Sequence, residues 1–263
     1  MTVLKQPTTA FVPTMGALHA GHESLIKLAR TLTDEVLVSI FVNPLQFENA
    51  DDLAKYPRTP ESDKAIALAA GATQVWLPTV DEIYPEKVDL VDSGEIGKLF
   101  EGAARTGHFD GMLTVVKRLF ELTAPRWAIF GEKDFQQLFL VKSMITRFNL
   151  PIEIVSAPII RESDGLAMSS RNVRLSPEGR KAAIVISQGL SKATALQDLA
   201  LARTTLTDAL SNEPLFTVDY AEIIDEATFL PADSIETNNR AIVAGWINGV
   251  RLLDNMAMSR VSL

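Results

Sequence analysis

The segment AFVPTMGALHAGH, from Ala10 to His22, joins a short apolar run through a glycine-bearing turn to a predicted helix. A strand that ends in such a turn and opens a helix is a natural phosphate site. The N–H groups of the first helical turn have no intrahelical partner, and the helix dipole adds partial positive charge. His19 and His22 add hydrogen-bond donors, and Gly21 lets the backbone approach a ligand closely. The segment therefore predicts a site that suits a triphosphate.

Two other interpretations of the histidine pair stay open at this point. One is a metal pair, but the His-Glu-x-x-His pattern of zinc proteases is absent, and the chain has no Cys and only one further histidine, His108. The other is an ordinary surface loop, which would be preferred if the segment stood alone. It does not stand alone, because further polar motifs follow predicted strands.

The composition of the chain is that of a soluble globular protein. Its 263 residues are enough for a large core and two lobes, and 47% of them are hydrophobic and 22% charged. The net charge of −8 argues against a general nucleic-acid binder, although basic residues can still gather in a cleft for an anionic ligand. The lack of Cys excludes disulfides and thiol catalysis and fits a reducing compartment.

We expect no targeting or membrane segment. The first residues, MTVLKQP, lack a charged leader followed by an apolar core, so no signal peptide is predicted. No apolar run approaches the roughly 20 residues of a membrane helix. The expectation is a cytoplasmic protein that has neither nucleic acid nor a membrane as a partner.

Strand-like and helix-like segments alternate through the first two-thirds of the chain. The alternation predicts strands at residues 9–13, 35–41, 73–77, 126–130 and 152–157, and helices at residues 23–32, 60–70, 109–122 and 134–148. Thr59 as N-cap, Pro60 at the first helical position and Gly71 at the end delimit the second helix. Alternation at this spacing predicts a parallel sheet with right-handed crossovers, which is a doubly wound, Rossmann-like α/β fold.

The pattern changes near Ser176, where Ser-Pro-Glu begins a helix. Residues 182–210 are rich in Ala and Leu and predict two helices with a break near Leu190 and Ser191. Three strands follow at residues 216–224, 240–247 and 250–254, and we expect them to be antiparallel. The predicted domain boundary therefore lies near Leu175. Residues 1–175 form the doubly wound domain, and residues 176–263 form a smaller α+β domain that serves as a lid.

Polar side chains follow several of the predicted strands. Asn43 and Gln46 follow the second strand, whereas Lys133 and Asp134 follow a later one, after Gly131 at a predicted tight turn. Ligands of doubly wound sheets bind beyond the carboxyl ends of the strands, which is where these residues and the two histidines are expected. Amides there suit hydroxyls or a carboxylate, and a lysine suits phosphate. Ordinary helix capping by Asp134 beside a solvated lysine is the alternative.

Two further motifs place cations and hydroxyls in loops. The segment DGLAMSSRN, from Asp164 to Asn172, sets two serines beside an arginine, and such donors suit phosphate oxygens, with a flexible polar loop as the alternative. Its Met-Ser-Ser part resembles the second signature of synthetases that activate carboxylates, with Ser170 where that signature has lysine. The segment RTGHFDG, from Arg105 to Gly111, opens a helix with a cationic loop. A structural and a ligand-binding interpretation of its histidine are equally open.

Together these motifs resemble the pantoate–β-alanine ligase family. The matching stretches occur in the family's order, at residues 13–22, 41–47, 56–58, 107–109, 131–137 and 164–172, and more weakly at residues 251–255. No single motif is decisive, whereas the ordered set is highly specific. One departure is Thr106, where many members of the family have proline.

The resemblance implies an enzyme that uses ATP to join pantoate to β-alanine, giving pantothenate, AMP and pyrophosphate through a pantoyl-adenylate. It also implies Mg²⁺ carried by the phosphates of ATP without a metal site of the protein's own, and a homodimer formed by the N-terminal lobes. The implied catalytic residues are His22, His19 and Lys133, with His22 assisting the departure of pyrophosphate.

The residues implied to bind substrates form two sets, one for ATP and one for pantoate or β-alanine. Those expected at the ATP site are Met15, Gly16, Ala17, Leu18, His19, Ala20, Gly21, His22, Gly131, Glu132, Lys133, Asp134, Ile160, Met168, Ser169, Ser170 and Arg171. Those expected to contact pantoate or β-alanine are Gln46, Gln137, Asn43 and Tyr56. No general base for the amine of β-alanine is evident in the sequence.

Two other functions remain as alternatives. A nucleotidyltransferase of the same His-x-Gly-His superfamily would transfer an adenylyl group to a phosphate ester. The amides of Asn43, Gln46 and Gln137 argue against it, because a phosphorylated acceptor would call for more cations. The second alternative is a non-catalytic nucleotide-binding module, and the retention of every candidate polar group argues against that.

Overall fold

The computed structural model describes residues 8–48 and 50–259. Its contacts divide the chain into two compact units. Unit 1 comprises the residues up to Glu132 together with Gln136–Pro158, and unit 2 comprises Lys133–Phe135 together with the residues from Ile159 onward. These contacts place the division after Pro158, earlier in the chain than the predicted domain boundary. The domain boundary near Leu175 stays a prediction. Within the described part, no helix is both long and apolar enough to span a membrane.

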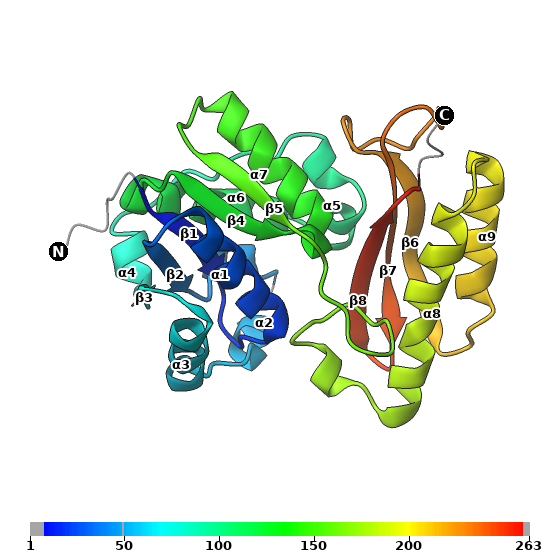
Figure 1. Cartoon of the computed structure of the whole chain (residues 1–263), viewed down its shortest axis with the longest axis horizontal. Helices are drawn as coiled ribbons and strands as arrows, with labels where there is room; N and C mark the ends of the chain where they lie inside the picture. The colour runs from blue at the N-terminus through cyan, green and yellow to red at the C-terminus, as the bar shows by residue number, and fades with distance from the viewer. Residues whose placement is uncertain (1–7, 49, 260–263) are drawn as a thin grey trace. The chain divides into compact units, whose positions relative to one another are not determined.

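A five-stranded parallel sheet forms the centre of unit 1 (Figure 1). Its strand order is β3-β2-β1-β4-β5, so the chain winds outward from β1 in one direction and from β4 in the other. In register, Ala10 of β1 lies opposite Val36 of β2 and Trp127 of β4. The doubly wound parallel sheet predicted from the sequence is confirmed. The reversal of strand order between β1 and β4 marks the edge at which such folds bind ligands. The strands are β1 (Ala10–Thr14), β2 (Val36–Ile40), β3 (Gln74–Trp76), β4 (Trp127–Gly131) and β5 (Glu153–Ala157).

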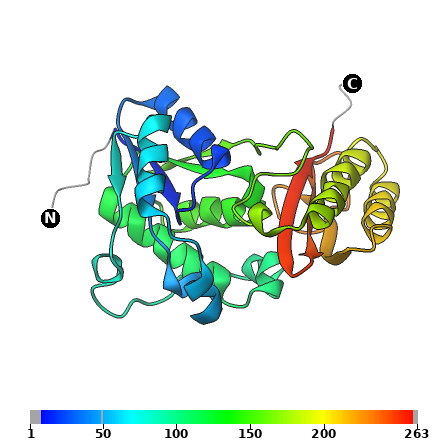
Figure 2. The same cartoon turned by 90° about the horizontal axis from the view of Figure 1, so that it is seen from below.

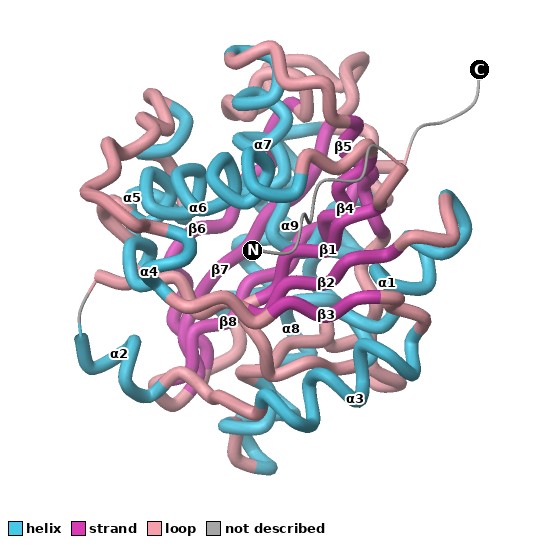
Figure 3. Tube along the Cα trace, turned by 90° about the vertical axis from the view of Figure 1, so that its left-hand side faces the viewer, coloured by secondary structure: helices cyan, strands magenta, loops and turns pink. Residues whose placement is uncertain are grey.

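Helices cover both faces of this sheet (Figure 3). Helices α1 (Ala20–Leu32) and α3 (Pro60–Ala70) cover one face, and α6 (His108–Thr123) and α7 (Phe135–Arg147) cover the other. Alternation along β1 explains why both faces are apolar. Ala10 and Val12 pack with the side chains of α1 and α3. Phe11 points the other way and meets Phe120 of α6 edge-on, with ring centroids 6.3 Å apart.

Short elements complete unit 1. They are the 3-10 helices η1 (Pro44–Gln46) and η2 (Ile96–Lys98), and the short helices α2 (Ala50–Lys55), α4 (Val80–Ile83) and α5 (Glu101–Ala104). The 3-10 helix η3 (Glu132–Asp134) has its first residue in unit 1 and the other two in unit 2. Helix α3 ends at Gly71, whose φ of +113° is the left-handed conformation expected of a glycine cap. Helix α1 begins earlier than the predicted residue 23, because His19 caps it.

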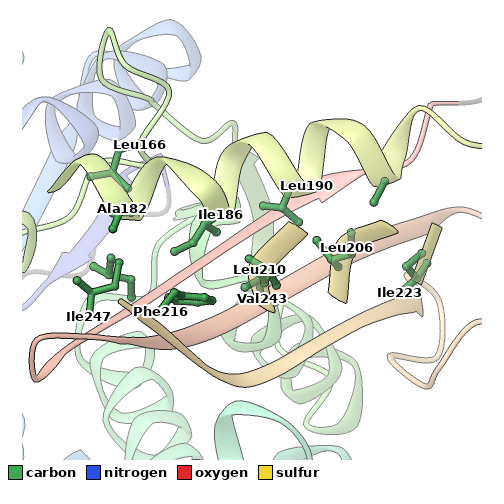
Figure 4. Close-up of a cluster of buried hydrophobic side chains, with 14 of the residues drawn as sticks. Leu166, Ala182, Ile186, Leu190, Leu206, Leu210, Phe216, Ile223, Val243 and Ile247 are labelled. Carbon is green, nitrogen blue, oxygen red and sulfur yellow. The ribbon is translucent and has the colours of Figure 1, made fainter. Parts of the chain in front are cut away.

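Unit 2 is a three-stranded antiparallel sheet with two helices on one face (Figure 2). The elements are β6 (Phe216–Asp225), β7 (Asn239–Ile247), β8 (Val250–Ala257), α8 (Pro177–Thr194) and α9 (Leu199–Ser211), and 3-10 helix η4 (Asn172–Arg174) precedes them. The predicted antiparallel arrangement is confirmed. Leu190, Leu206 and Val243 are fully buried in the core between the helices and the sheet (Figure 4).

The predicted break near Leu190 and Ser191 is wrong. Helix α8 continues to Thr194, because Ile186, Leu190 and Ala193 keep one apolar face directed into the core. Helix α9 starts only after Asp198, whose side chain accepts a hydrogen bond from the N–H of Leu201 at 2.9 Å. The Asp198 cap therefore sets the start of α9.

Candidate active site

The turn between β1 and α1 carries the two histidines. Gly16 and Ala17 have left-handed backbone, with φ of +86° and +52°. His19 has extended backbone and is the N-cap residue of α1. Left-handed backbone costs a residue that has a Cβ about 1–2 kcal/mol, so Ala17 must be held by its surroundings. The shape of this turn therefore depends on contacts from elsewhere in unit 1.

The carboxylate of Asp63, on α3, supplies those contacts. Its two oxygens accept hydrogen bonds from the N–H of Ala17 at 3.0 Å and of Leu18 at 2.8 Å. The hydroxyl of Thr59 donates to the same carboxylate at 3.1 Å, and Asp63 is only 1% exposed. A Cβ on Gly16 would lie 2.9 Å from Asp63 Oδ2. Glycine is thus required at this position both by its φ and by the approach of the carboxylate.

His19 and His22 each accept a backbone hydrogen bond through ring atom Nδ1. The N–H of Gly21 donates to His19 Nδ1 at 3.1 Å, and the N–H of His19 donates to His22 Nδ1 at 3.3 Å. The two rings form a capping box, with centroids 4.2 Å apart. Because Nδ1 is the acceptor, the proton of each neutral ring is on Nε2. Both imidazoles can therefore donate from Nε2 at a helix N-terminus, where negative charge is stabilised.

Asn43 and Gln46 are buried together at η1, directly after β2. Asn43 is 1% exposed and Gln46 is 6% exposed. Asn43 Nδ2 donates to Gln46 Oε1 at 3.2 Å and to the carbonyl of Gly111 at 3.1 Å. The hydroxyl of Tyr84 donates to Asn43 Oδ1 at 2.9 Å, and burial raises the pKa of this phenol, which keeps it protonated. Gln46 Nε2 lies 2.9 Å from Met15 Sδ, so a residue predicted for pantoate lies against one predicted for ATP.

Helix α6 approaches η1 closely at Gly111. A Cβ on Gly111 would lie 2.0 Å from the carbonyl oxygen of Leu45, well inside any real contact distance. Only glycine permits this approach. The approach also brings the carbonyl of Gly111 within reach of Asn43. This explains the last glycine of the RTGHFDG motif.

Tyr56 directly follows α2 and contacts the segment after η1. Its ring is edge-on to the ring of Phe47, with centroids 5.6 Å apart, and Phe47 directly follows Gln46. The neighbouring Arg58 donates to backbone carbonyls of α2, including that of Leu53 at 3.0 Å. Arg58 therefore stabilises the C-terminal end of a helix, where cations are favoured.

The motif after β4 is divided between the two units. Gly131 is the last residue of β4 and pairs with Ala157, and it does not have the left-handed backbone that a tight glycine turn would require. Glu132–Asp134 form η3, and Gln137 lies in the first turn of α7.

Lys133–Phe135 are in contact with the sheet of unit 2. The carbonyl of Lys133 accepts a hydrogen bond from Asn255 Nδ2 at 2.9 Å. The guanidinium of Arg240 lies 3.9 Å from the ring centroid of Phe135, and the ring of Phe229 stacks on Phe135 at 6.0 Å. These contacts fix the backbone of Lys133 and the ring of Phe135 within unit 2.

Residues 160–172 of unit 2 fold back on themselves. The N–H of Met168 donates to the carbonyl of Ile160 at 2.9 Å, which brings these two predicted ATP contacts together. Ser169 Oγ accepts from the N–H of Arg171 at 3.2 Å, and η4 begins directly afterwards. Ser170 lies between them, so the predicted phosphate-binding serines and arginine form one compact turn.

Ion pairs anchor this loop to α8. Arg180 lies 2.7 Å from an oxygen of Glu162 and 2.7 Å from an oxygen of Asp164. Asn172 Nδ2 donates to Glu162 Oε1 at 2.9 Å. The hydrogen bond from Arg180 is the main reason why the pKa of Glu162 is lowered, although desolvation acts in the opposite direction. Both ends of the DGLAMSSRN motif are thus held by charge-assisted contacts.

Several residues that shape the β1–α1 turn, η1 and the loop at residues 160–172 carry no sequence signal that could have revealed them. Asp63, Tyr84 and Arg180 act through contacts with residues far away in the sequence and belong to no motif. Asp254 is a partial exception, since the weakly matching residues 251–255 include it. It pairs with Arg161 through both carboxylate oxygens, at 2.5 Å and 3.0 Å. In the described ranges, 8–48 and 50–259, no three His, Asp or Glu side chains are grouped closely enough to hold a metal ion.

Comparison with known proteins assigns the chain to a family. The model of a family described as pantoate-beta-alanine ligase matches residues 2–257. The chain belongs to this family. The family resemblance drawn from the ordered motifs is therefore confirmed, and the pantoate-beta-alanine ligases are a family of enzymes.

Relatives of similar length support the assignment to the pantoate-beta-alanine ligases. A pantothenate synthetase from Acidothermus cellulolyticus is 46% identical over 264 residues, which cover 95% of this chain and 86% of that protein. A pantothenate synthetase from Aquifex aeolicus is 45% identical over 252 residues, covering 93% of this chain and 89% of that protein.

Solved structures of the same family share the fold. Pantothenate synthetase from Thermus thermophilus has a TM-score of 0.92 and 43% identity, with 96% of this chain and 94% of that chain covered. Pantoate-beta-alanine ligase from Francisella tularensis, complexed with beta-gamma ATP and beta-alanine, has a TM-score of 0.80 and 34% identity, with 98% and 92% covered.

Proposed function

We propose that this protein catalyses the ATP-dependent condensation of pantoate with β-alanine to pantothenate, AMP and pyrophosphate. The observation that carries the proposal is the pair of imidazoles at the start of α1. Both have Nδ1 occupied as an acceptor and are therefore donors at Nε2. Buried amides that suit a hydroxy acid lie close by, because Gln46 contacts Met15 of the same turn. Family membership supports the same reaction.

In the first half-reaction an oxygen of the pantoate carboxylate attacks the α-phosphorus of ATP. A new P–O bond forms, the bond to the β-phosphate oxygen breaks, and pyrophosphate leaves with the electron pair. The enzyme contributes mainly positioning and stabilisation of the charge on the phosphate oxygens. His19 and His22 donate to the phosphates, and His22 hydrogen-bonds to the leaving pyrophosphate.

Amides hold pantoate for this attack. Gln46 and Gln137 each offer both a donor and an acceptor, which suits the hydroxyls and carboxylate of pantoate. Asn43 orients Gln46 through the bond from its Nδ2 to Gln46 Oε1. Tyr56 contributes its phenol near the same loop.

The residues of unit 2 have a separate part in the proposal, which rests on their chemistry and on the family motifs. Lys133, Ser169, Ser170 and Arg171 neutralise charge on the β- and γ-phosphates. Mg²⁺ accompanies ATP on its phosphate oxygens and waters, which suits the metal's preference for those ligands. Asp134, Ile160 and Met168 also contact the nucleotide, as do Gly131 and Glu132 of unit 1, some of them through backbone groups.

In the second half-reaction the amine of β-alanine attacks the acyl carbon of the pantoyl-adenylate. The C–N bond forms, AMP leaves with its oxygen, and the amine loses a proton. No side chain is assigned as a general base, since an amine that arrives neutral needs none for the attack. A homodimer formed by the N-terminal lobes, a C-terminal lid and a cytoplasmic location complete the proposal.

The decisive experiment is an assay of the purified protein with ATP, Mg²⁺ and pantoate, with and without β-alanine. We expect AMP and pantothenate to appear together only with both substrates. Pantoate alone should support exchange of labelled pyrophosphate into ATP, because the first half-reaction is reversible. Pyrophosphate release without AMP, given another acceptor, would instead indicate a nucleotidyltransferase. ATP binding without any turnover would leave a binding module.

A further inference from the structure

His108 occupies the first turn of α6 and contacts the backbone of the predicted pantoate loop. Its side chain is buried, with an exposed fraction of 8%. His108 Nδ1 lies 2.9 Å from the carbonyl oxygen of Gln46, and His108 Nε2 lies 2.9 Å from Arg105 Nη1. The imidazole therefore lies between an arginine and the main chain of a residue predicted to bind substrate.

The two partners determine the protonation of this ring. A carbonyl oxygen can only accept, so Nδ1 carries the proton and donates to Gln46. A guanidinium can only donate, so Nε2 carries a lone pair and accepts from Arg105. His108 is thus a neutral imidazole in its Nδ1–H form, which is the opposite tautomer to that of His19 and His22. An imidazole that uses both nitrogens in this way has none left for a substrate proton.

The contact fixes the end of η1 at the point where Gln46 presents its amide. The amide oxygen of Gln46 accepts from Asn43, while its amide nitrogen lies against Met15 Sδ. The side chain is therefore held by Asn43 and the backbone by His108. Loss of either hydrogen bond would let the amide of Gln46 move relative to a bound hydroxy acid.

Arg105 connects His108, through Glu101, to Gln136 of α7. Its guanidinium lies 3.5 Å from a carboxylate oxygen of Glu101. The N–H of Glu101 donates to Gln136 Oε1 at 3.0 Å, and Gln136 Nε2 donates to the carbonyls of Ile96 and Leu99. Gln136 directly precedes Gln137, so one series of contacts joins the surroundings of both predicted pantoate glutamines.

We propose that His108 is a positioning residue for pantoate, which acts by holding the carbonyl of Gln46 and, through Arg105, by joining η1 to the start of α7. This inference rests on the proposed function, in which Gln46 and Gln137 bind pantoate. It assigns His108 no contact with substrate and no proton transfer.

Two isosteric variants separate the two nitrogens of the ring. In His108→Asn the side-chain amide nitrogen replaces Nδ1 and can still donate to Gln46. In His108→Gln the terminal amide replaces Nε2 and faces Arg105, so the donor to Gln46 is lost. We expect the pantoate KM to stay within about threefold of wild type in H108N and to rise about tenfold in H108Q, the size of one lost hydrogen bond. The ATP KM of both should be unchanged, which also shows that the variants are folded.

Further variants keep the outcomes distinguishable. In Gln46→Ala the pantoate KM must rise, and an unchanged value would refute the proposed role of Gln46 itself. If Q46A is impaired while H108N and H108Q have the same pantoate KM as each other, the positioning role of His108 is overturned. Arg105→Met should raise the pantoate KM less than H108Q, because it removes the contacts of Arg105 with His108 and Glu101 but keeps the bond from His108 to the carbonyl of Gln46. An equal rise in the pantoate and ATP KM values of H108Q would indicate a general structural role and would also overturn the proposal.

Discussion

Asp63 and Leu18 are 45 positions apart in the sequence, yet the carboxylate of one accepts the backbone N–H of the other at 2.8 Å. The second oxygen of Asp63 binds the N–H of Ala17. The carboxylate therefore holds two consecutive amides of the turn that leads into His19. A helix in the next βα unit thus sets the conformation of the predicted phosphate turn.

Replacing Asp63 with alanine should therefore weaken both the fold and nucleotide binding. The substitution leaves two buried N–H groups without an acceptor, which costs about 2–4 kcal/mol in the free energy of unfolding. The ATP KM should rise, because the bond from Ala17 to Asp63 compensates for the left-handed backbone of that residue. Urea unfolding and steady-state kinetics measure the two effects. D63N, which keeps one acceptor oxygen, should fall between D63A and wild type. Asp89→Ala at an exposed position is the control and should change neither quantity.

His22 combines a capping role with a proposed chemical role, and the two can be separated. Asparagine can place an acceptor near the position of Nδ1 but has no donor at the position of Nε2. H22N should therefore retain most of the thermal stability and lose about 10²–10³-fold in kcat, whereas H22A should lose kcat and about 1 kcal/mol of stability as well. Thermal unfolding and the pyrophosphate exchange assay test this pair. Full turnover in H22N would show that the Nε2 donor is dispensable.

The sequence was sufficient to predict the parallel sheet and the location of the polar residues at its carboxyl edge. Apolar strands and amphipathic helices are local patterns, and a residue that follows a strand must lie at that edge once the strands are parallel. Asn43, Gln46 and the two histidines could be placed in this way. Their tautomers and partners could not, since these depend on backbone groups brought together only by folding.

The remaining features depend on contacts between distant segments. Nothing near Arg180 indicates that it pairs with Glu162 and Asp164, and nothing near Tyr84 indicates its bond to Asn43. Gly131 was expected to permit a tight turn, but the strand continues through it. The misplaced helix break near Leu190 and Ser191 has the same origin, because burial of Leu190 in the core of unit 2 keeps α8 continuous through these residues.

Gly111→Ala tests the close approach of α6 to η1. In an unconstrained helix this change would stabilise by about 0.5–1 kcal/mol, because alanine has the higher helix propensity. Here the added Cβ would lie 2.0 Å from the carbonyl of Leu45, so the helix must move and we expect a net loss of about 1–3 kcal/mol. The pantoate KM should rise in parallel, because Gln46 follows Leu45. Gly189→Ala on α8 is the matched control: its nearest neighbour, the Cβ of Ala209, is 3.4 Å away, and it should be neutral or stabilising. A G111A enzyme that is more stable than wild type would contradict the close approach of α6 to the carbonyl of Leu45.

The ion pair between Arg180 and Glu162 predicts an acid-dependent loss of stability in unit 2. Hydrogen bonding to Arg180 lowers the pKa of Glu162 from its ordinary value of 4.5, so the folded state binds this proton less readily than the unfolded chain. The resulting stabilisation is complete above about pH 5 and is lost as the pH falls through the lowered value. Both side chains are partly exposed, so the effect is modest and should weaken with salt.

Calorimetry between about pH 6 and about pH 3 measures this dependence. Glu162→Gln removes the titrating group, and Arg180→Met removes the cause of the lowered pKa. Both should have a lower Tm than wild type at the upper end of this range and converge toward it at the lower end, where the wild-type pair is itself disrupted. Glu178→Gln, at an exposed position on the same helix, should follow the wild-type curve. A constant difference in Tm across the whole range for E162Q would show that the pair contributes by packing and not by charge.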